Sequence, residues 1–135
     1  MSSSAIPDLW PEDIAHISTT PPLVVLQEQA QKLAQKTGKL VCATVDSTAE
    51  RSQSFIHTFS LIAPALGNYT CRLFRVKHGV HFYPLEILTD IDVPNFRAAS
   101  QDDFIRALAE IFASAPVKKV VQSLMAQSRA TQLNR

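Results

Sequence analysis

A meander of three strand-like segments constrains the fold of this chain more than any other feature. The segments are residues 54–64, 69–78 and 80–88, and short turns at residues 65–68 and 78–79 join them. Their apolar residues fall on one face, which is typical of strands that bury one side. A meander with one apolar face needs other elements to cover it, so the pattern predicts helices packed on that face.

The lengths of the two turns predict which residues pair across the strands. A four-residue turn places Phe59 opposite Phe74, and a two-residue turn places Phe74 opposite Tyr83. Cross-strand partners share a face of the sheet. The residues predicted on the core face are Phe55, His57, Phe59, Leu61, Ala63, Arg72, Phe74, Val76, His81, Tyr83, Leu85 and Ile87. The residues predicted on the opposite face are Ile56, Thr58, Ser60, Ile62, Cys71, Leu73, Arg75, Lys77, Val80, Phe82, Pro84 and Glu86.

Helical patterns flank the meander. Residues 21–36 carry an apolar stripe at helical spacing, and residues 40–45 read as a further strand whose register stays open. A second helix begins after Ser100, and Pro116 either opens a third helix or kinks the second. The order predicts an α+β fold: an N-terminal helix, a four-stranded antiparallel meander sheet, then one or two C-terminal helices packed on one sheet face.

We expect a single domain with a loose segment at each end. Residues 20–125 form the predicted α+β domain, residues 1–19 a partly ordered N-terminal arm, and residues 126–135 a frayed C-terminal tail. Prolines interrupt regular structure along the arm. Because Trp10 is too apolar for a simple tail, we expect it to pack on the body of the protein or on a partner.

The charge balance and the N-terminal sequence argue against several classes of function. The 13 basic and 12 acidic residues give a formal net charge of +1, too little to attract a nucleic acid. No apolar run approaches the ~18 residues of a membrane span, and the first residues lack the features of a signal peptide. Cys42 and Cys71 lack the spacing of a zinc site, so we read them as reduced. We therefore expect a cytoplasmic protein with no cofactor, no metal ion, no nucleic acid and no membrane as a partner.

The histidines at one end of the meander are the nearest thing to a chemical cluster. His57 and His81 flank Val76 on the predicted core face, and His78 lies in the turn at the same end. Two strand spacings separate His57 from His81, which is too far for a clear pair of metal ligands. We expect hydrogen-bonded imidazoles at the rim of the core.

Arg72 is the most unusual residue of the predicted core face. A guanidinium in an apolar layer needs a partner, because its desolvation costs several kcal/mol. The guanidinium is expected to meet a carboxylate, such as Glu110 or Glu28, or backbone carbonyls, or to extend to water past the helices. A further alternative is that it binds an anion. This last reading predicts a pocket for a carboxylate or phosphate at the histidine end of the core face. The ligand-binding residues in this reading are His57, Arg72, His81 and Tyr83.

The opposite face of the meander is a candidate interface. Apolar residues surrounded by a few charges are typical of surfaces that bind another protein or a second copy. The alternative is that the N-terminal arm folds over this face. The predicted interface residues are Trp10, Ile56, Leu73 and Phe82.

The sequence contains no recognisable catalytic motif. It has no Gly-x-Ser-x-Gly elbow and no cysteine beside a histidine, and its three glycines do not form a phosphate-binding loop. We therefore expect no catalytic residues and a non-enzymatic binding, regulatory or accessory module that self-associates as a homodimer, or binds a protein partner, through the outer sheet face. The alternative is a small-anion-binding or enzymatic domain with its pocket at the histidine end.

Overall fold

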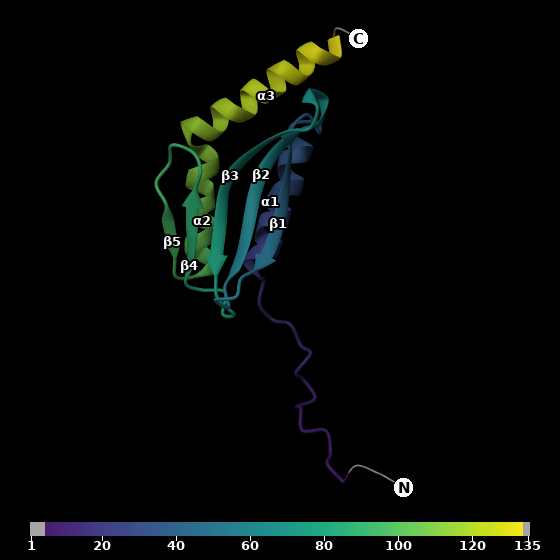
Figure 1. The fold of residues 1–135 in the computed structure, drawn as a ribbon, viewed down its shortest axis with the longest axis vertical. Helices are drawn as coiled ribbons and strands as arrows, with labels where there is room; N and C mark the ends of the chain where they lie inside the picture. The colour runs from purple at the N-terminus through teal and green to yellow at the C-terminus, as the bar shows by residue number, and fades with distance from the viewer. Residues whose placement is uncertain (1–4, 134–135) are drawn as a thin grey trace.

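A computed structural model describes residues 5–133 of the chain. Within this part, the fold is α+β, with three α-helices and a five-stranded antiparallel sheet in the order β1-β2-β3-β4-β5 (Figure 1). In chain order, the elements are α1 (Pro22–Lys36), β1 (Cys42–Ala49), β2 (Phe55–Ala63), the short 3-10 helix η1 (Pro64–Leu66), β3 (Tyr69–His78), β4 (Leu85–Thr89), β5 (Phe96–Ala98), α2 (Gln101–Ala113) and α3 (Ala115–Leu133). The predicted class is confirmed, and the sheet has one strand more than predicted.

The helices lie on one side of the sheet. Helix α1 packs behind β1, α2 packs behind the β5 side, and α3 crosses the end of the sheet beside η1 (Figure 1). We call the covered side the core face. No helix or strand of residues 5–133 covers the other side, which we call the outer face.

Stacked aromatic rings form the centre of the core. Phe59 of β2 lies opposite Phe74 of β3, and their rings stack with centroids 5.0 Å apart and planes 3° from parallel. Phe112 of α2 covers both rings, at centroid distances of 5.5 Å and 6.0 Å. The predicted pairing of Phe59 with Phe74 is therefore confirmed, and it connects the sheet to a helix.

A β-bulge in β3 changes which residues of this strand face the core. The β2–β3 turn has five residues instead of the predicted four, and Leu73 is left without a partner between the pairs Phe59–Phe74 and Ser60–Arg72. The extra residue puts Leu73 in the core with no exposed surface, whereas Arg72 lies on the outer face. The predicted faces of Leu73 and Arg72 are therefore wrong, and that of Cys71, which packs against the core, is wrong for the same reason.

The second hairpin has a six-residue loop instead of the predicted two-residue turn. His78 pairs with Leu85, so residues 79–84 leave the sheet, including the cis Tyr83-Pro84 bond. Pro84 has no N–H to contribute to a strand ladder, which favours a loop there. Tyr83 therefore does not pair with Phe74, and its predicted position in the sheet is wrong. Because the shift in register is an even number of residues, Leu85 still faces the core, as predicted.

The C-terminal region adds a short strand and two separate helices. Strand β5, which the sequence did not predict, pairs with β4 at the edge of the sheet. Ser100 caps α2 as predicted, since its hydroxyl accepts a hydrogen bond from the Asp103 N–H at 3.2 Å. Helix α3 begins at Ala115 and is helical as far as Leu133, so fraying from residue 126 is wrong; residues 134–135 lie outside the described residues. None of the helices in residues 5–133 combines the length and the apolar character needed to cross a membrane.

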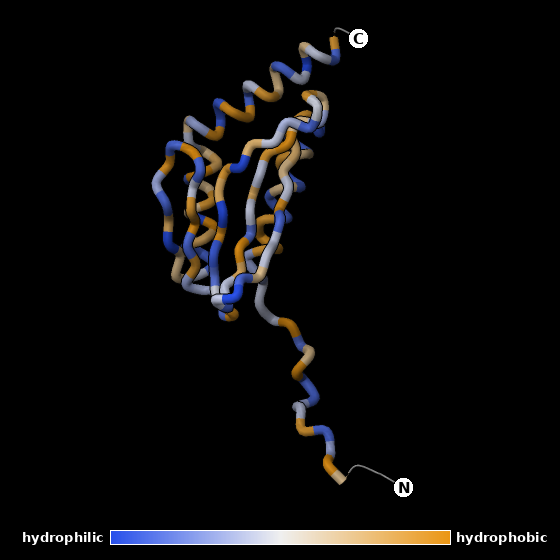
Figure 2. The backbone as a smooth tube through the Cα atoms, in the orientation of Figure 1, coloured by the Kyte–Doolittle hydropathy of each residue, from blue (hydrophilic) through white to orange (hydrophobic). Residues whose placement is uncertain are grey.

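The described part of the N-terminal arm, residues 5–19, extends away from the body (Figure 1). Figure 2 shows apolar residues recurring along it between polar ones. Its backbone closes one turn where the Ile14 N–H bonds to the Pro11 carbonyl at 3.2 Å, and another where the His16 N–H bonds to the Asp13 carbonyl at 2.9 Å. The Trp10 side chain is 72% exposed, so it does not pack on the body of the same chain.

Replacing Phe59 by alanine removes one ring of the central stack. Because this ring is 1% exposed, we expect the free energy of unfolding to fall by about 3–5 kcal/mol, measured by urea denaturation. Phe55→Ala is the matched control, since Phe55 lies on the same strand with 37% of its surface exposed. An equal loss in the two variants would contradict the central role of the stack.

Candidate functional site

A serine and two histidines form a line of hydrogen bonds across three strands, which we call the histidine row. Ser47 Oγ of β1 lies 2.6 Å from His57 Nδ1 of β2, and His57 Nε2 lies 2.8 Å from His78 Nε2 of β3. The row ends at the backbone carbonyl of Gly79, which lies 2.6 Å from His78 Nδ1. It is the most connected polar arrangement on the core face.

Strand register brings these residues together. Ser47 lies directly opposite His57, and His57 lies opposite Val76, two residues before His78. Residues two apart on a strand share a face, so His78 becomes a diagonal neighbour of His57 once β3 extends that far. The predicted pairing of His57 with Val76 therefore held the signal for this contact, and the error was to place His78 in a two-residue turn with Gly79.

The acceptors of the row determine where its protons lie. A backbone carbonyl only accepts hydrogen bonds, so the proton of His78 is on Nδ1 and its Nε2 accepts. His57 then donates from Nε2 to His78, and its Nδ1 accepts from the Ser47 hydroxyl. With both rings neutral, each of these donors has an acceptor. Protonating both rings would bring two N–H donors together at the His57–His78 contact.

Burial keeps His57 neutral. His57 and His78 are 5% and 7% exposed, and Phe55 stacks on His78 at a centroid distance of 5.5 Å. The ring of Phe82 meets His78 edge-on at 5.8 Å. Burial lowers the pKa of His57, and charge on His78 lowers it further. His57 is therefore a neutral hydrogen-bond acceptor for Ser47 near pH 7.

A cavity of about 200 Å³ lies beside the end of the row, and we call it the histidine-end cavity. Its lining includes His78, Ser54 and two cationic side chains, Lys77 and Arg97, together with Glu86. Ser47 and His57 line neither this cavity nor the two larger ones found in the described residues. The exposed residue Ser47 thus has a neutral base beside it, and neither Ser47 nor His57 lines one of these three cavities.

The four residues predicted to line an anion pocket do not converge. His57 contacts His78, whereas His81 is exposed in the loop of residues 79–84. Tyr83 packs edge-on against Phe104 of α2 at 6.5 Å, and its buried hydroxyl has no partner among the described residues. Arg72 lies on the opposite side of the sheet.

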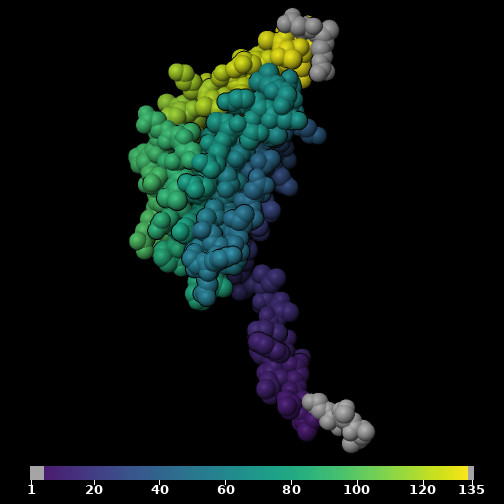
Figure 3. All heavy atoms as spheres, in the orientation of Figure 1, coloured from purple at the N-terminus to yellow at the C-terminus, as the bar shows by residue number. Residues whose placement is uncertain are grey.

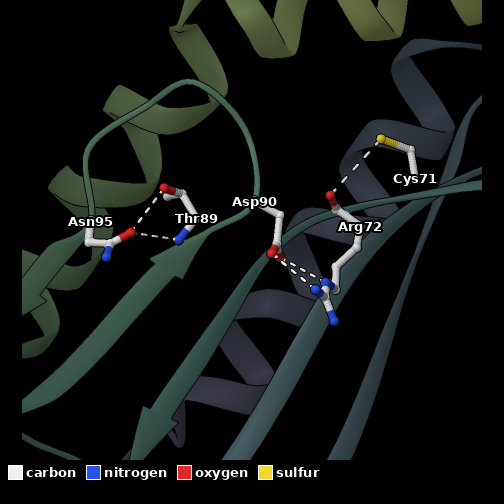
Figure 4. Close-up of polar contacts among 5 residues, drawn as sticks. All are labelled: Cys71, Arg72, Thr89, Asp90 and Asn95. Carbon is white, nitrogen blue, oxygen red and sulfur yellow. Dashed lines mark hydrogen bonds and ion pairs between the residues drawn. The ribbon is translucent and has the colours of Figure 1, made fainter.

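Arg72 makes a two-point ion pair on the outer face. Its Nε lies 2.8 Å from Asp90 Oδ2 and its Nη2 lies 3.1 Å from Asp90 Oδ1 (Figure 4). The Asp90 N–H also donates to the carbonyl of the bulged residue, Leu73, at 2.9 Å. The partner of Arg72 is therefore Asp90, and the predicted partners Glu110 and Glu28 are wrong. With 51% of the Arg72 side chain exposed, the pair contributes little to stability.

The outer face has a row of cations beside two half-buried isoleucines. Figure 3 views this face. Arg75 and Lys77 follow Arg72 along β3, and Ile56 and Ile62 of the neighbouring strand β2 are half-buried. The Nε atom of Arg75 is buried and has no hydrogen-bond partner among the described residues. Such an atom needs an acceptor, because an unpaired buried donor costs about 1–3 kcal/mol.

The four predicted interface residues do not form one surface. Ile56 lies on the outer face, whereas Leu73 is in the core. Phe82 contacts His78 at the histidine end, and Trp10 is exposed on the N-terminal arm. Sequence reasoning missed Arg75 as the most unusual residue of this face, because its half-burial depends on its neighbours across β2 and β4.

Within residues 5–133, no group of three or more His, Cys, Asp or Glu side chains is placed to hold a metal ion. Cys42 and Cys71 are both free thiols. Compared with protein-family models, with curated proteins and with solved structures, the chain matches none of them. The proposals below therefore rest on the geometry of this structure alone.

The lowered pKa of His57 predicts a pH-dependent stability. In the unfolded chain, a histidine titrates near pH 6.5. Below that pH, His57 therefore takes up a proton more readily in the unfolded state than in the folded state. The contribution of neutral His57 to the free energy of unfolding is complete above pH 6.5, and it is lost as the pH falls through the lowered pKa of the folded state. We expect the urea midpoint to drop between pH 8 and pH 5.5, and His57→Phe to reduce this drop.

Exposed His81 supplies the control for this experiment. His81→Asn should leave the drop in urea midpoint as it is in the wild type. A drop of the same size in the His57→Phe protein would show that other groups cause the pH dependence.

Proposed function

We propose that this protein is a non-enzymatic binding module that forms a homodimer through its outer face. The observation that supports this most is the enclosed Nε of Arg75, which lacks an acceptor on a face that no other element covers. A partner surface that supplies a carboxylate or a carbonyl there would satisfy the atom. An uncovered face alone is common in antiparallel sheets, so the argument depends on Arg75.

The composition of the outer face is consistent with pairing between two copies. Ile56 and Ile62 supply apolar surface near the two ends of β2, and cations and carboxylates, including Asp46 and Glu86, lie beside them on the same face. In a two-fold contact, the same surface of both copies meets. The cations of one copy can therefore pair with the carboxylates of the other. The proposal includes a cytoplasmic location, which the two free cysteines support.

An enzymatic role is less well supported by the same geometry. Ser47 and His57 have the contact of a nucleophile and its base, but a hydrolase also needs a cavity beside the nucleophile. None of the cavities described above has either residue in its lining. We therefore assign the histidine row a structural role at the rim of the core.

Ile56→Glu should disrupt the homodimer. The substitution puts a charge at a half-buried apolar position of the outer face, where a partner copy would have to desolvate it. Light scattering after gel filtration should give a smaller mass for the variant than for the wild type, because the variant loses its outer-face contact. Ile105→Glu, at a position 46% exposed on α2, is the control and should leave the dimer intact. A wild-type protein that stays monomeric at high concentration would overturn the proposal.

A second candidate function is the binding of a small inorganic anion in the histidine-end cavity. Its volume of about 200 Å³ is below the roughly 300–1,000 Å³ of typical small-molecule sites. Lys77 and Arg97 supply positive charge there. The size and the charge together fit phosphate or sulfate better than an organic ligand.

Phosphate should raise the melting temperature if this cavity binds it. We expect a larger rise with phosphate than with chloride at equal ionic strength, because only a specific site discriminates between them. Arg97→Ala should abolish the difference. Arg106→Ala removes an exposed arginine of α2 that pairs with Asp103 and should preserve the difference. Equal effects of phosphate on the two variants would argue against this site.

A further inference from the structure

The N-terminal arm holds large apolar side chains in solvent. Leu9 is 80% exposed, Trp10 72%, Ile14 60% and Ile17 84%. Soluble proteins expose single apolar residues routinely, but four large ones within nine positions of one segment are more than a routine exposure. Such a segment is expected to be buried in some state of the protein.

The spacing of these residues is that of a helix that binds in a groove. Trp10, Ile14 and Ile17 lie at positions i, i+4 and i+7, which share one face of a helix. Pro11 suits the first position of such a helix, and the Ile14 N–H already bonds to its carbonyl at 3.2 Å. The His16 N–H bonds to the Asp13 carbonyl at 2.9 Å in the same way. The arm therefore contains the beginning of an amphipathic helix.

The arm is acidic. Asp8, Glu12 and Asp13 lie between its apolar residues, and no lysine or arginine precedes Lys32 in the chain. A surface that binds the arm is thus expected to combine an apolar floor with positive charge.

A groove on the core side has this character. It has a volume of about 320 Å³ and lies between α1 and the junction of α2 and α3; we call it the helix groove. Its floor includes Phe59, Leu61 and Leu73 of the sheet. Leu33, Phe112 and Val121, each half-buried, line it from the helices.

Lysines surround this apolar lining. Lys32 and Lys36 come from α1 and Lys118 from α3, and no aspartate or glutamate lines the groove. The groove is therefore complementary to the arm in both polarity and charge. Its volume is at the lower end of the range for small-molecule sites, which suits one large side chain such as Trp10 with a smaller neighbour.

We propose that the N-terminal arm of one copy docks in the helix groove of a second copy. The direction of the arm favours a second copy over its own body. Pro21, in an extended conformation with φ −65° and ψ 152°, directs the arm away from the start of α1 (Figure 1). The groove is lined by the last two turns of α1, so an arm binding its own body would have to reverse direction at the Pro21-Pro22 pair.

The exchange of arms is reciprocal. Each copy has one arm and one helix groove, so two copies satisfy each other in a closed pair. This contact uses the side of the molecule opposite the outer face, and it stands independently of the dimer proposed above.

The single tryptophan of the chain reports on the docking directly. We expect the emission of Trp10 to shift to shorter wavelength as the protein concentration rises, since the indole moves from water into the groove. Lys118→Glu should weaken this association by about tenfold or more, because it places like charges together. Lys119→Glu is the matched control: it alters the next residue of α3, which does not line the groove.

Two charge-reversed proteins test whether the arm comes from a second copy. Lys32→Glu/Lys118→Glu reverses the groove, and Glu12→Lys/Asp13→Lys reverses the arm. Each protein alone should keep the emission of an exposed indole. Mixing them pairs each arm with a groove of opposite charge, so the shift to shorter wavelength should return.

Three results would overturn the proposal. They are an emission that stays that of an exposed indole at all concentrations, a shift that does not depend on concentration, and a mixture that behaves as the sum of its two components. The second result would indicate that each arm binds its own body. Ile56→Glu, which tests the outer face, should leave the concentration-dependent shift in place, so failure of one contact is distinguishable from failure of the other.

Discussion

The stack of Phe59 on Phe74 under Phe112 is the contact on which the rest of the structure depends. It sets the register of the two central strands and attaches α2 to the sheet at the same point. From this register follow the position of His57 opposite Val76 and therefore the contact between His57 and His78. The floor of the helix groove also begins at Phe59. A core contact thus positions both the polar row and the apolar groove.

Sequence reasoning succeeded where side-chain pattern and turn chemistry agreed. The Phe59–Phe74 pairing followed from apolar alternation, and the cap at Ser100 followed from its spacing to Asp103. Sequence reasoning failed where backbone geometry decides which face a residue lies on. The sequence around Leu73 carries no glycine or proline that marks a bulge. The loop of residues 79–84 was missed because His78-Gly79 resembles a tight turn. Pro84 was the contrary signal, since a proline has no N–H to donate within a strand.

The candidate sites were less predictable than the fold. Anion binding was assigned to residues on the assumption that Arg72 faces the helices, and the bulge places Arg72 with Asp90 on the other side of the sheet. The same displacement made Leu73 a core residue instead of an interface residue. One misplaced residue in a strand exchanges its two faces, so a site built from several strands inherits every error of register. Arg75 and the helix groove depend on packing between elements, which no local pattern encodes.

The bulge at Leu73 has a consequence for changes in chain length. In most central strands, a one-residue deletion forces every side chain beyond it onto the wrong side of the sheet. Here the pairs on either side of Leu73, Ser60–Arg72 and Phe59–Phe74, would become consecutive rungs of a regular ladder if Leu73 were absent. β3 is therefore a strand that can become one residue shorter during evolution while its inward and outward side chains keep their directions.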